Sequence, residues 1–230
     1  MEKSKKSQKH SQIIIDVAAG KKRLTDALFE LKILLSDLDN SEVNSWIESE
    51  LSGYKKGDVP EYRKLRGTMF GTLQYVSMGA MINRKMAIPV KVDKLDSTNV
   101  NMTDNITTIE NYANSEDSSD LSIPVDLRIA NHIADLEISA YCQIMSAGIK
   151  IPPSKFTDII NGVKQRVLDV LIMLEKRHGN LDNYTVSFGS KKEKAEAAQT
   201  IIQIIHNGDQ ISVGDNNKID KSAIGKDNEN

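Results

Sequence analysis

Apolar residues recur at helical spacing through the first fifty residues of the chain. Five leucines keep to one face of a predicted helix, at positions 24, 28, 31, 35 and 38. Asn40 and Ser41 then provide an N-cap for a second helix, predicted from about residue 42 to residue 51. Gly53 can take the left-handed conformation that ends a helix, so the second helix is predicted to stop there.

The helical pattern stops between Tyr62 and Val90. Glycines at positions 67, 71 and 79 disfavour a helix. Apolar residues between positions 70 and 78, and again between 86 and 92, are typical of strands. With a turn at residues 83–85, this segment predicts a small antiparallel sheet or hairpin. Polar residues then dominate positions 96–123, which we expect to form a loop with a short helix at 104–113.

Two long apolar patterns in the second half of the chain predict a pair of helices. The first begins at Pro124, covers a wide apolar arc and ends at Gly148. The second follows an extended link at Pro152 and Pro153, is capped by Ser154 and continues nearly to residue 179. Because the link is short, we expect the two helices to be antiparallel neighbours that form the stability core.

The end of the chain has a different pattern. Residues 184–188 predict a short strand, and the capping-box sequence that starts at Ser190 predicts a last helix through Ile205. A tail with two Gly-Asp steps follows. The predicted fold is α+β and mostly helical: a helical bundle with a small antiparallel sheet, then a C-terminal helix and a beta-forming or disordered tail. We expect one domain at residues 11–185 and the helix with its tail at 190–230.

Composition excludes several classes of protein. The net charge is −2 and the isoelectric point about 6.1, so neither nucleic acid nor an anionic membrane is expected as a partner. Cys142 is the single cysteine, which excludes a disulfide framework, and we expect it to be an inert residue of a buried helix. The apolar run at residues 13–19 is interrupted by Asp16 and is too short to span a bilayer. The chain is therefore expected to be cytoplasmic.

Arg128 and His132 are the weak catalytic candidates. At positions i and i+4 they share one helix face, where proton transfer at an RNA 2′-hydroxyl is conceivable. The pair resembles the Arg…His pair of HEPN ribonucleases, but three residues separate the two here, whereas that motif has four to six. A surface or capping histidine is the favoured interpretation.

Paired carboxylates do not predict a metal site. Glu48 and Glu50 lie two residues apart, as do Asp135 and Glu137, so the members of each pair point in different directions on a helix. Neither the glycines at positions 67 and 71 nor any other segment continues into a phosphate-binding loop. We expect no cofactor and no metal.

Two short blocks of sequence carry a family resemblance. Residues 46–54 read Trp-Ile-Glu-Ser-Glu-Leu-Ser-Gly-Tyr, and residues 60–63 read Pro-Glu-Tyr-Arg. Together they resemble the N-terminal signature of the AbiTii domain of bacterial abortive-infection proteins. Residues 151–154 and 159–175 are similar to the second helical block of that domain. The resemblance covers residues 11–180 and implies a role in defence against phage. The matched residues are mostly apolar, capping or turn residues, so the resemblance carries over no catalytic residue.

The sequence predicts a phage-defence protein that is a non-enzymatic sensing or protein-interaction module. Its partner is expected to be a phage or host protein, or a companion effector. The candidate binding residues are Trp46, Tyr54, Tyr62, Arg63 and Arg166. For the aromatic residues, a role as core anchors is favoured over a recognition patch. Charged residues of the last long helix fit either a partner-facing surface or a solvated face: Lys164, Arg166, Glu175, Lys176 and Arg177. The alternative functions are a HEPN-like ribonuclease using Arg128 and His132, and an oligomerisation module built through residues 190–225.

Overall fold

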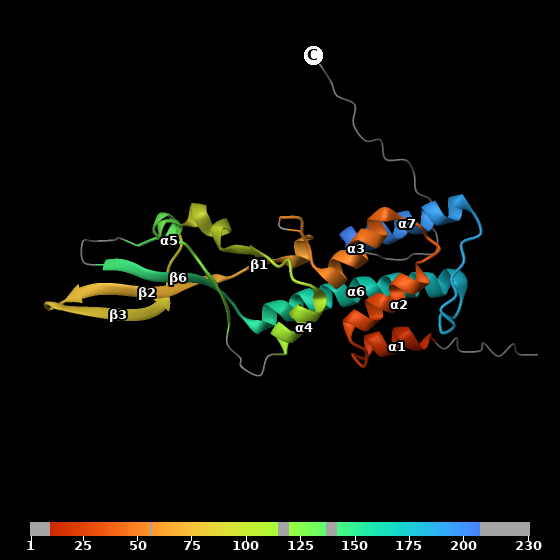
Figure 1. The fold of residues 1–230 in the computed structure, drawn as a ribbon, viewed down its shortest axis with the longest axis horizontal. Helices are drawn as coiled ribbons and strands as arrows, with labels where there is room; N and C mark the ends of the chain where they lie inside the picture. Colours follow the sequence, from red (N-terminus) through yellow and green to blue (C-terminus); the bar gives the residue numbers. More distant parts are fainter. Residues whose placement is uncertain (1–9, 56, 115–119, 137–141, 208–230) are drawn as a thin grey trace, which may run out of the picture.

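A computed structural model describes residues 10–55, 57–114, 120–136 and 142–207, and the account below concerns these residues. The molecule is elongated, with helices gathered at one end and a sheet projecting at the other (Figure 1). We call these two parts the helical body and the sheet arm. The predicted class, a mostly helical α+β fold with antiparallel sheets and a C-terminal helix, is confirmed.

The helical body is built around one long helix, α6 (Pro153–His178). Five shorter helices surround it: α1 (Gln12–Ala18), α2 (Leu24–Leu34), α3 (Ser41–Ser52), α4 (Ile106–Ala113) and α7 (Lys191–Asn207). The apolar side of α6 is fully enclosed at Ile159, Val163, Val167 and Val170. The predicted leucine face is also buried at all five positions, from Leu24 to Leu38. Burial of such side chains stabilises the fold by about 1.5–3 kcal/mol each, before entropy is subtracted.

Local sequence signals set the helix ends in this body. The Asn40 side chain accepts hydrogen bonds from the backbone N–H groups of Glu42 (3.1 Å) and Val43 (3.0 Å), as its predicted capping role requires. Gly53 follows α3 with a φ of +98°, a conformation that residues with a Cβ rarely adopt. The short helix predicted at 104–113 is α4, which is capped by the side chain of Asn105.

The sheet arm holds four antiparallel strands in the order β3-β2-β6-β5. Their bounds are β2 (Thr68–Ser77), β3 (Ala80–Ala87), β5 (Leu121–Pro124) and β6 (Cys142–Ile151). Helix α5 (Leu127–Ile133) packs on one face, where it forms a second, smaller core with Met69, Leu73, Ile88 and Ile144. Between arm and body lie the 3-10 helices η1 (Glu61–Arg63) and η2 (Val92–Thr98), and a two-stranded sheet of β1 (Lys64–Arg66) and β4 (Asn99–Asn101).

The predicted hairpin is present, but its turn is not where the sequence pattern placed it. The two central turn residues are Met78 and Gly79, both with positive φ, and residues 83–85 lie within β3. A two-residue turn of this hand matches the twist of the flanking strands. The glycine spacing has a separate cause. A Cβ on Gly71 would lie 1.9 Å from the carbonyl oxygen of Ser146, so the absent side chain lets β6 approach β2.

The buried helix predicted over residues 124–148 is wrong. Asp126 caps a helix of only seven residues, and the apolar run that follows becomes strand β6. That run pairs with β2 along most of its length and with β5 at residues 148–151, so its backbone groups are satisfied by sheet partners there. Sheet pairing therefore overrides the helical spacing of the sequence. The predicted antiparallel helix pair does not exist, and Cys142 lies half-buried on a strand.

Three predictions concern the chain after α6. The short strand predicted at 184–188 is wrong, because these residues form no regular element. Ser190 does cap α7, with its hydroxyl accepting from the Glu193 N–H at 3.2 Å, and the Glu193 carboxylate accepts from the Gly189 N–H at 2.7 Å. The Gly-Asp tail lies outside the described residues. In the described ranges, no helix combines the length and the apolar character needed to cross a membrane.

Candidate functional site

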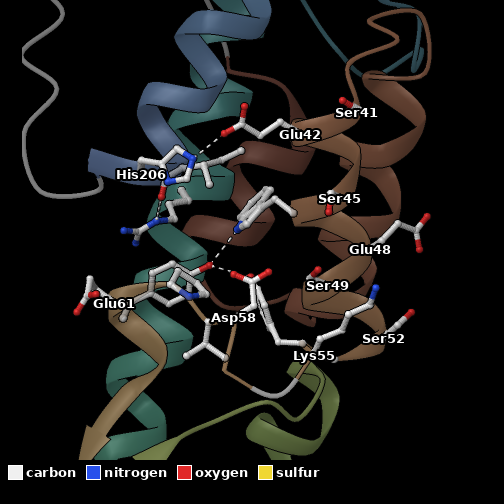
Figure 2. Close-up of a pocket in the computed structure, with 18 residues that line it drawn as sticks. Ser41, Glu42, Ser45, Glu48, Ser49, Ser52, Lys55, Asp58, Glu61 and His206 are labelled. Atoms are coloured by element: carbon white, nitrogen blue, oxygen red, sulfur yellow. Dashed lines mark hydrogen bonds and ion pairs between the residues drawn. The ribbon is translucent and has the colours of Figure 1, made fainter.

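A cleft of about 1000 Å³ opens in the helical body between α3, residues 53–55 and 58–62, and the end of α7 (Figure 2). Four of the five candidate binding residues line it: Trp46, Tyr54, Tyr62 and Arg166. The structure therefore brings together residues that lie as far as 120 positions apart in the sequence. We call this feature the α3 cleft.

One face of α3 presents a row of serines to the α3 cleft. Ser41, Ser45, Ser49 and Ser52 are spaced at helical intervals, and Figure 2 shows them along one side of the opening. Among the described residues, none of their hydroxyl groups has a hydrogen-bond partner. These hydroxyls can therefore both donate to and accept from a ligand.

Trp46 belongs both to the main core and to the cleft wall. Its side chain is part of the core cluster, and the residue is 6% exposed. The indole Nε1–H donates to the Tyr62 hydroxyl at 2.9 Å. Trp46 therefore both anchors the core and lines the cleft.

Behind the aromatic wall lies a fully buried ion pair between Glu50 and Arg63. Arg63 Nη2 donates to Glu50 Oε2 at 2.5 Å, and its Nη1 donates to the backbone carbonyls of Met102 (3.2 Å) and Asp104 (2.6 Å). The other Glu50 oxygen accepts from the hydroxyls of Tyr54 (2.6 Å) and Tyr62 (2.7 Å). Buried charges persist when they are paired and hydrogen-bonded in this way.

This network shifts the ionisation of its members. Burial, together with the negative charge of Glu50, raises the pKa of both Tyr54 and Tyr62, so the two phenols stay protonated and keep donating. Burial alone would lower the pKa of Arg63, but the charge of Glu50 and its hydrogen bond raise it. The two phenols and the guanidinium therefore keep their protons. Arg63, although it was a candidate binding residue, is fully enclosed and does not line the cleft.

Arg166 closes the other side of the cleft. The alternative of a solvated helix face does not fit this residue, which is only 8% exposed although it lines the cleft. Its guanidinium lies over the Tyr62 ring at 4.1 Å, while Nε donates to the Ile205 carbonyl (2.8 Å) and Nη1 to the Gly162 carbonyl (2.8 Å). Ile205 lies in the last turn of α7, where a cation is favourable. Arg166 thus fastens α7 to α6 and supports the ring of Tyr62.

Comparison with known proteins identifies the family. The AbiTii family model matches residues 10–201, which is more than half of the chain and includes every helix of the body except the last residues of α7. The chain belongs to the AbiTii family. No match was found among curated proteins or among solved structures. The blocks that carry the resemblance in this AbiTii chain, residues 46–54 and 60–63, supply both members of the buried ion pair and three aromatic residues of the cleft wall.

The weak catalytic candidates lie elsewhere in the AbiTii structure. Arg128 and His132 are exposed on α5 in the sheet arm, and neither lines the α3 cleft. Arg128 Nε donates to the carboxylate of Asp126 at 3.2 Å, so its guanidinium is held at the start of its own helix.

The carboxylate pairs are also separated. Glu48 forms an ion pair with Lys32, whereas Glu50 pairs with Arg63; Glu137 lies outside the described residues. Within the described ranges, no group of three His, Cys, Asp or Glu side chains could hold a metal ion.

Sequence reasoning missed three features of the cleft. The serine row follows a helical period at positions 41, 45, 49 and 52, so that signal was available in the sequence. The burial of Arg166 could also have been predicted, because its position falls on the same face of α6 as the apolar residues Ile159, Val163 and Val170. The contribution of α7 was not readable, since only the tertiary fold brings Ile205 and His206 to α3. There His206 Nε2 lies 2.8 Å from the Glu42 carboxylate.

Proposed function

We propose that this AbiTii-family protein acts in phage defence as a non-enzymatic sensing module that binds a protein partner in the α3 cleft. The partner is a phage or host protein or a companion effector, and binding takes place in the cytoplasm. Family membership supports the defence role. The observation that carries the binding site is the convergence of Trp46, Tyr54, Tyr62 and Arg166 on one cleft beside four unpaired serine hydroxyls.

The lining has the composition of a protein-recognition surface. Antibody binding loops are enriched in tyrosine and serine, with tryptophan and arginine at the positions that contribute most to binding energy. The rigid aromatic side chains supply contact area, and the small hydroxyl groups supply adaptable hydrogen bonds. Tryptophan, tyrosine and arginine are also the residues that dominate binding energies at interfaces. The α3 cleft combines all four types within one opening.

The cleft wall is preorganised for binding. Tyr54 and Tyr62 both donate to the buried Glu50 carboxylate, and Tyr62 also accepts from the indole of Trp46. Because their hydroxyls are fixed and Arg166 stacks on one ring, these side chains lose little conformational freedom when a ligand arrives. The buried ion pair thus serves the recognition surface without touching the ligand.

Two neighbouring positions on α3 provide a matched test. Ser45 lines the cleft, whereas Asn44 is exposed on the same helix and does not line it. Ser45→Arg introduces a long cation into the opening, and Asn44→Arg introduces the same side chain outside it. Both should change the melting temperature by no more than about 2–4 °C, since exposed substitutions stay within about 0.5–1 kcal/mol. We expect Ser45→Arg to abolish protection against phage in a plaque assay and Asn44→Arg to retain it.

Three outcomes of that test are informative. Full protection by a stably folded Ser45→Arg variant contradicts the cleft as the recognition site. Equal loss of protection in both variants shows that charge on α3, rather than occupation of the cleft, is responsible. Loss confined to Ser45→Arg, with the melting temperature retained, supports the proposal.

A further inference from the structure

Strand β3 is a long strand at the edge of the sheet arm, and among the described residues no strand pairs with its outer side. In the order β3-β2-β6-β5 it has a neighbour on one side only. The turn between β2 and β3 has two residues, Met78 and Gly79. In this register the backbone N–H and C=O groups of every second β3 residue, beginning with Ala80, point toward β2. The groups of the remaining residues point outward: Met81, Asn83, Lys85 and Ala87. Among the described residues, nothing pairs with the backbone of these four.

The two edges of the sheet differ in the features that prevent strand addition. β5 has four residues and ends at Pro124, which lacks an N–H group. β3 has eight residues and no proline, and all but one of its residues are exposed. Natural proteins usually shorten or cover an edge of this kind, or interrupt it with a bulge. The β3 edge therefore offers a continuous template for an added strand.

Charge indicates what kind of strand fits. The four strands of the sheet carry three charged residues, Arg84, Lys85 and Lys150, and all three are positive although the whole chain is slightly acidic. Lys150 has Asp120 at 3.9 Å. Arg84 and Lys85 are exposed on the edge strand itself, and no carboxylate among the described residues forms an ion pair with either.

Apolar exposure adds to this edge. Val76, Met81 and Met86 are 42%, 74% and 43% exposed along the hairpin. Exposed methionines are typical of surfaces that adapt to a partner, because the unbranched side chain can repack. A second copy of β3 fits poorly: antiparallel self-pairing centred on this strand would place Arg84 opposite Arg84 or Lys85 opposite Lys85, and like charges across a sheet are destabilising.

We infer that the outer edge of β3 binds an extended, acidic segment of a partner protein by strand addition. Backbone hydrogen bonds to Met81, Asn83, Lys85 and Ala87 hold the segment. Arg84 and Lys85 lie on opposite faces of the sheet, so carboxylates on the two faces of the segment pair with one each. This site lies in the sheet arm, apart from the α3 cleft, and does not depend on the cleft's function.

The test uses the full chain and two synthetic eight-residue peptides, one repeating Val-Glu-Glu-Val and one repeating Val-Lys-Lys-Val, so that each peptide carries charge on both faces of an added strand. Hydrogen exchange of the β3 amides is followed by NMR. At saturating acidic peptide we expect exchange of the outward amides of Asn83 and Lys85 to slow at least about tenfold, as for newly formed backbone hydrogen bonds. The inward amides of Ile82 and Arg84 should be little changed, and the basic peptide should protect none of them.

Charge reversal supplies the specificity control. The double variant Arg84→Glu with Lys85→Glu should weaken binding of the acidic peptide at least about tenfold and create binding of the basic one. The control, Lys191→Glu with Lys192→Glu on α7, makes the same change in net charge and should leave acidic-peptide binding unaltered. Asn83→Pro removes one outward donor and should weaken binding without reversing its charge preference.

Several results overturn the inference. One is unchanged exchange of the outward amides at saturating acidic peptide. Another is concentration-dependent protection of these amides in the protein alone, which would assign the edge to a second copy of the chain. Equal binding of both peptides, or protection by a single-stranded oligonucleotide instead of the acidic peptide, would also exclude the proposed occupant. Ser45→Arg should bind the acidic peptide normally, which separates this result from the fate of the α3 cleft.

Discussion

The helical body and the sheet arm use their apolar residues in opposite ways. The body encloses its side chains around α6, whereas the arm has a core of only seven buried residues beneath α5. Seven of the twelve exposed large apolar side chains in the described ranges belong to the arm, and two more, Val92 and Leu95, lie in η2 between arm and body. The seven are Val76, Met78, Met81, Met86, Leu127, Ile129 and Met145. The buried apolar side chains that stabilise the fold are therefore concentrated in the body, whereas most exposed apolar side chains lie outside it.

The two proposed binding surfaces differ in the same way. The α3 cleft is a rigid opening whose wall is fixed by a buried ion pair and by stacking of Arg166 on Tyr62. The β3 edge is a line of free backbone groups that a partner strand completes. Side-chain identity therefore governs recognition in the cleft, while backbone pairing and charge govern it at the edge.

Removing α7 should have the largest effect on the body. Residues 11–185 are predicted to form a domain without residues 190–230, but α7 buries Ala197, Ala198, Ile201, Ile204 and Ile205 in the main core. At about 1.5–3 kcal/mol for each buried isoleucine, truncation after Gly189 should lower the melting temperature by at least about 10 °C. Truncation after Asn207 keeps α7 and should leave the melting temperature within about 2 °C of the full chain.

These two truncations decide where the stable unit ends. Circular dichroism of the shorter chain gives the test: a wholly unfolded chain contradicts the predicted boundary at 185. An unchanged melting temperature contradicts the packing of α7 on α3 and α6. Sedimentation of the same samples tests the oligomerisation hypothesis, which requires that a larger assembly be lost on truncation.

Breaking the buried ion pair should have the next largest effect. Arg63→Ala leaves the Glu50 carboxylate buried without its cation, which typically costs about 3–5 kcal/mol of unfolding free energy. We expect the variant to unfold at a much lower urea concentration than the parent chain and to lose protection against phage through loss of folded protein.

A double variant separates charge from packing. Glu50→Leu with Arg63→Met removes both charges and keeps apolar volume, so stability should recover above that of Arg63→Ala. Tyr54 and Tyr62 then lack their shared acceptor, so protection should stay impaired even where the fold is restored. A double variant no more stable than the single one would show that the surrounding hydrogen bonds, rather than the unpaired charge, dominate.

The sequence predicted the body far better than the arm, for a physical reason. Helix signals are local: the leucine face of α2, the Asn40 cap and the Ser190 cap were all present in short segments and are confirmed. The run at 142–151 carries apolar residues at spacings that fit a helix as well as a strand. Only its pairing with β2 and β5, which are distant in sequence, selects the strand.

The site residues also differ in whether short segments of sequence could predict their positions. The aromatic block at 46–62 was recognisable as a unit because its residues are close in sequence and match a family signature. The burial of Arg63 was not recognisable, since its partners Glu50, Met102 and Asp104 come from three separate segments. Two charged residues on α6, Arg166 and Glu175, do not lie on a solvated face for a similar reason: Glu175, only 7% exposed, is enclosed by the residue that precedes α1, whereas Lys176 and Arg177 are exposed.

Glu175 predicts a moderate, pH-dependent effect in the body. Its carboxylate accepts from the Ser11 N–H and Ser11 hydroxyl, both at 2.5 Å, and lies 2.6 Å from His10 Nδ1. Burial alone would raise the pKa of Glu175, but these contacts lower it below the usual 4.5. The ionised group therefore stabilises the fold above pH 4.5, and this contribution is lost as pH falls through the lowered pKa.

Glu175→Gln measures this contribution. The variant should lose about 1–2 kcal/mol at pH 7, since the contacts to a charged acceptor become contacts to a neutral one. The stability difference between variant and parent should shrink as pH falls from 5 to 3, because the parent loses its carboxylate over that range. Urea titrations at pH 3, 5 and 7 give the measurement. A difference that stays constant with pH would assign the loss to packing and not to ionisation.

The smallest expected effect is in the arm, at the two weak catalytic candidates. Arg128 and His132 are exposed on α5, and Asp126 retains its bond to the Arg128 backbone N–H after the side chain is removed. Combined replacement, Arg128→Ala with His132→Ala, should therefore change stability by no more than about 0.5 kcal/mol.

If the protein is a binding module, plaque protection should be retained and cellular RNA should stay intact during infection. A ribonuclease acting through this pair predicts the reverse: RNA cleavage by the parent chain that disappears in the variant, together with protection, at an unchanged melting temperature. Because the fold is preserved in either case, the two readouts distinguish chemistry in the arm from recognition in the body.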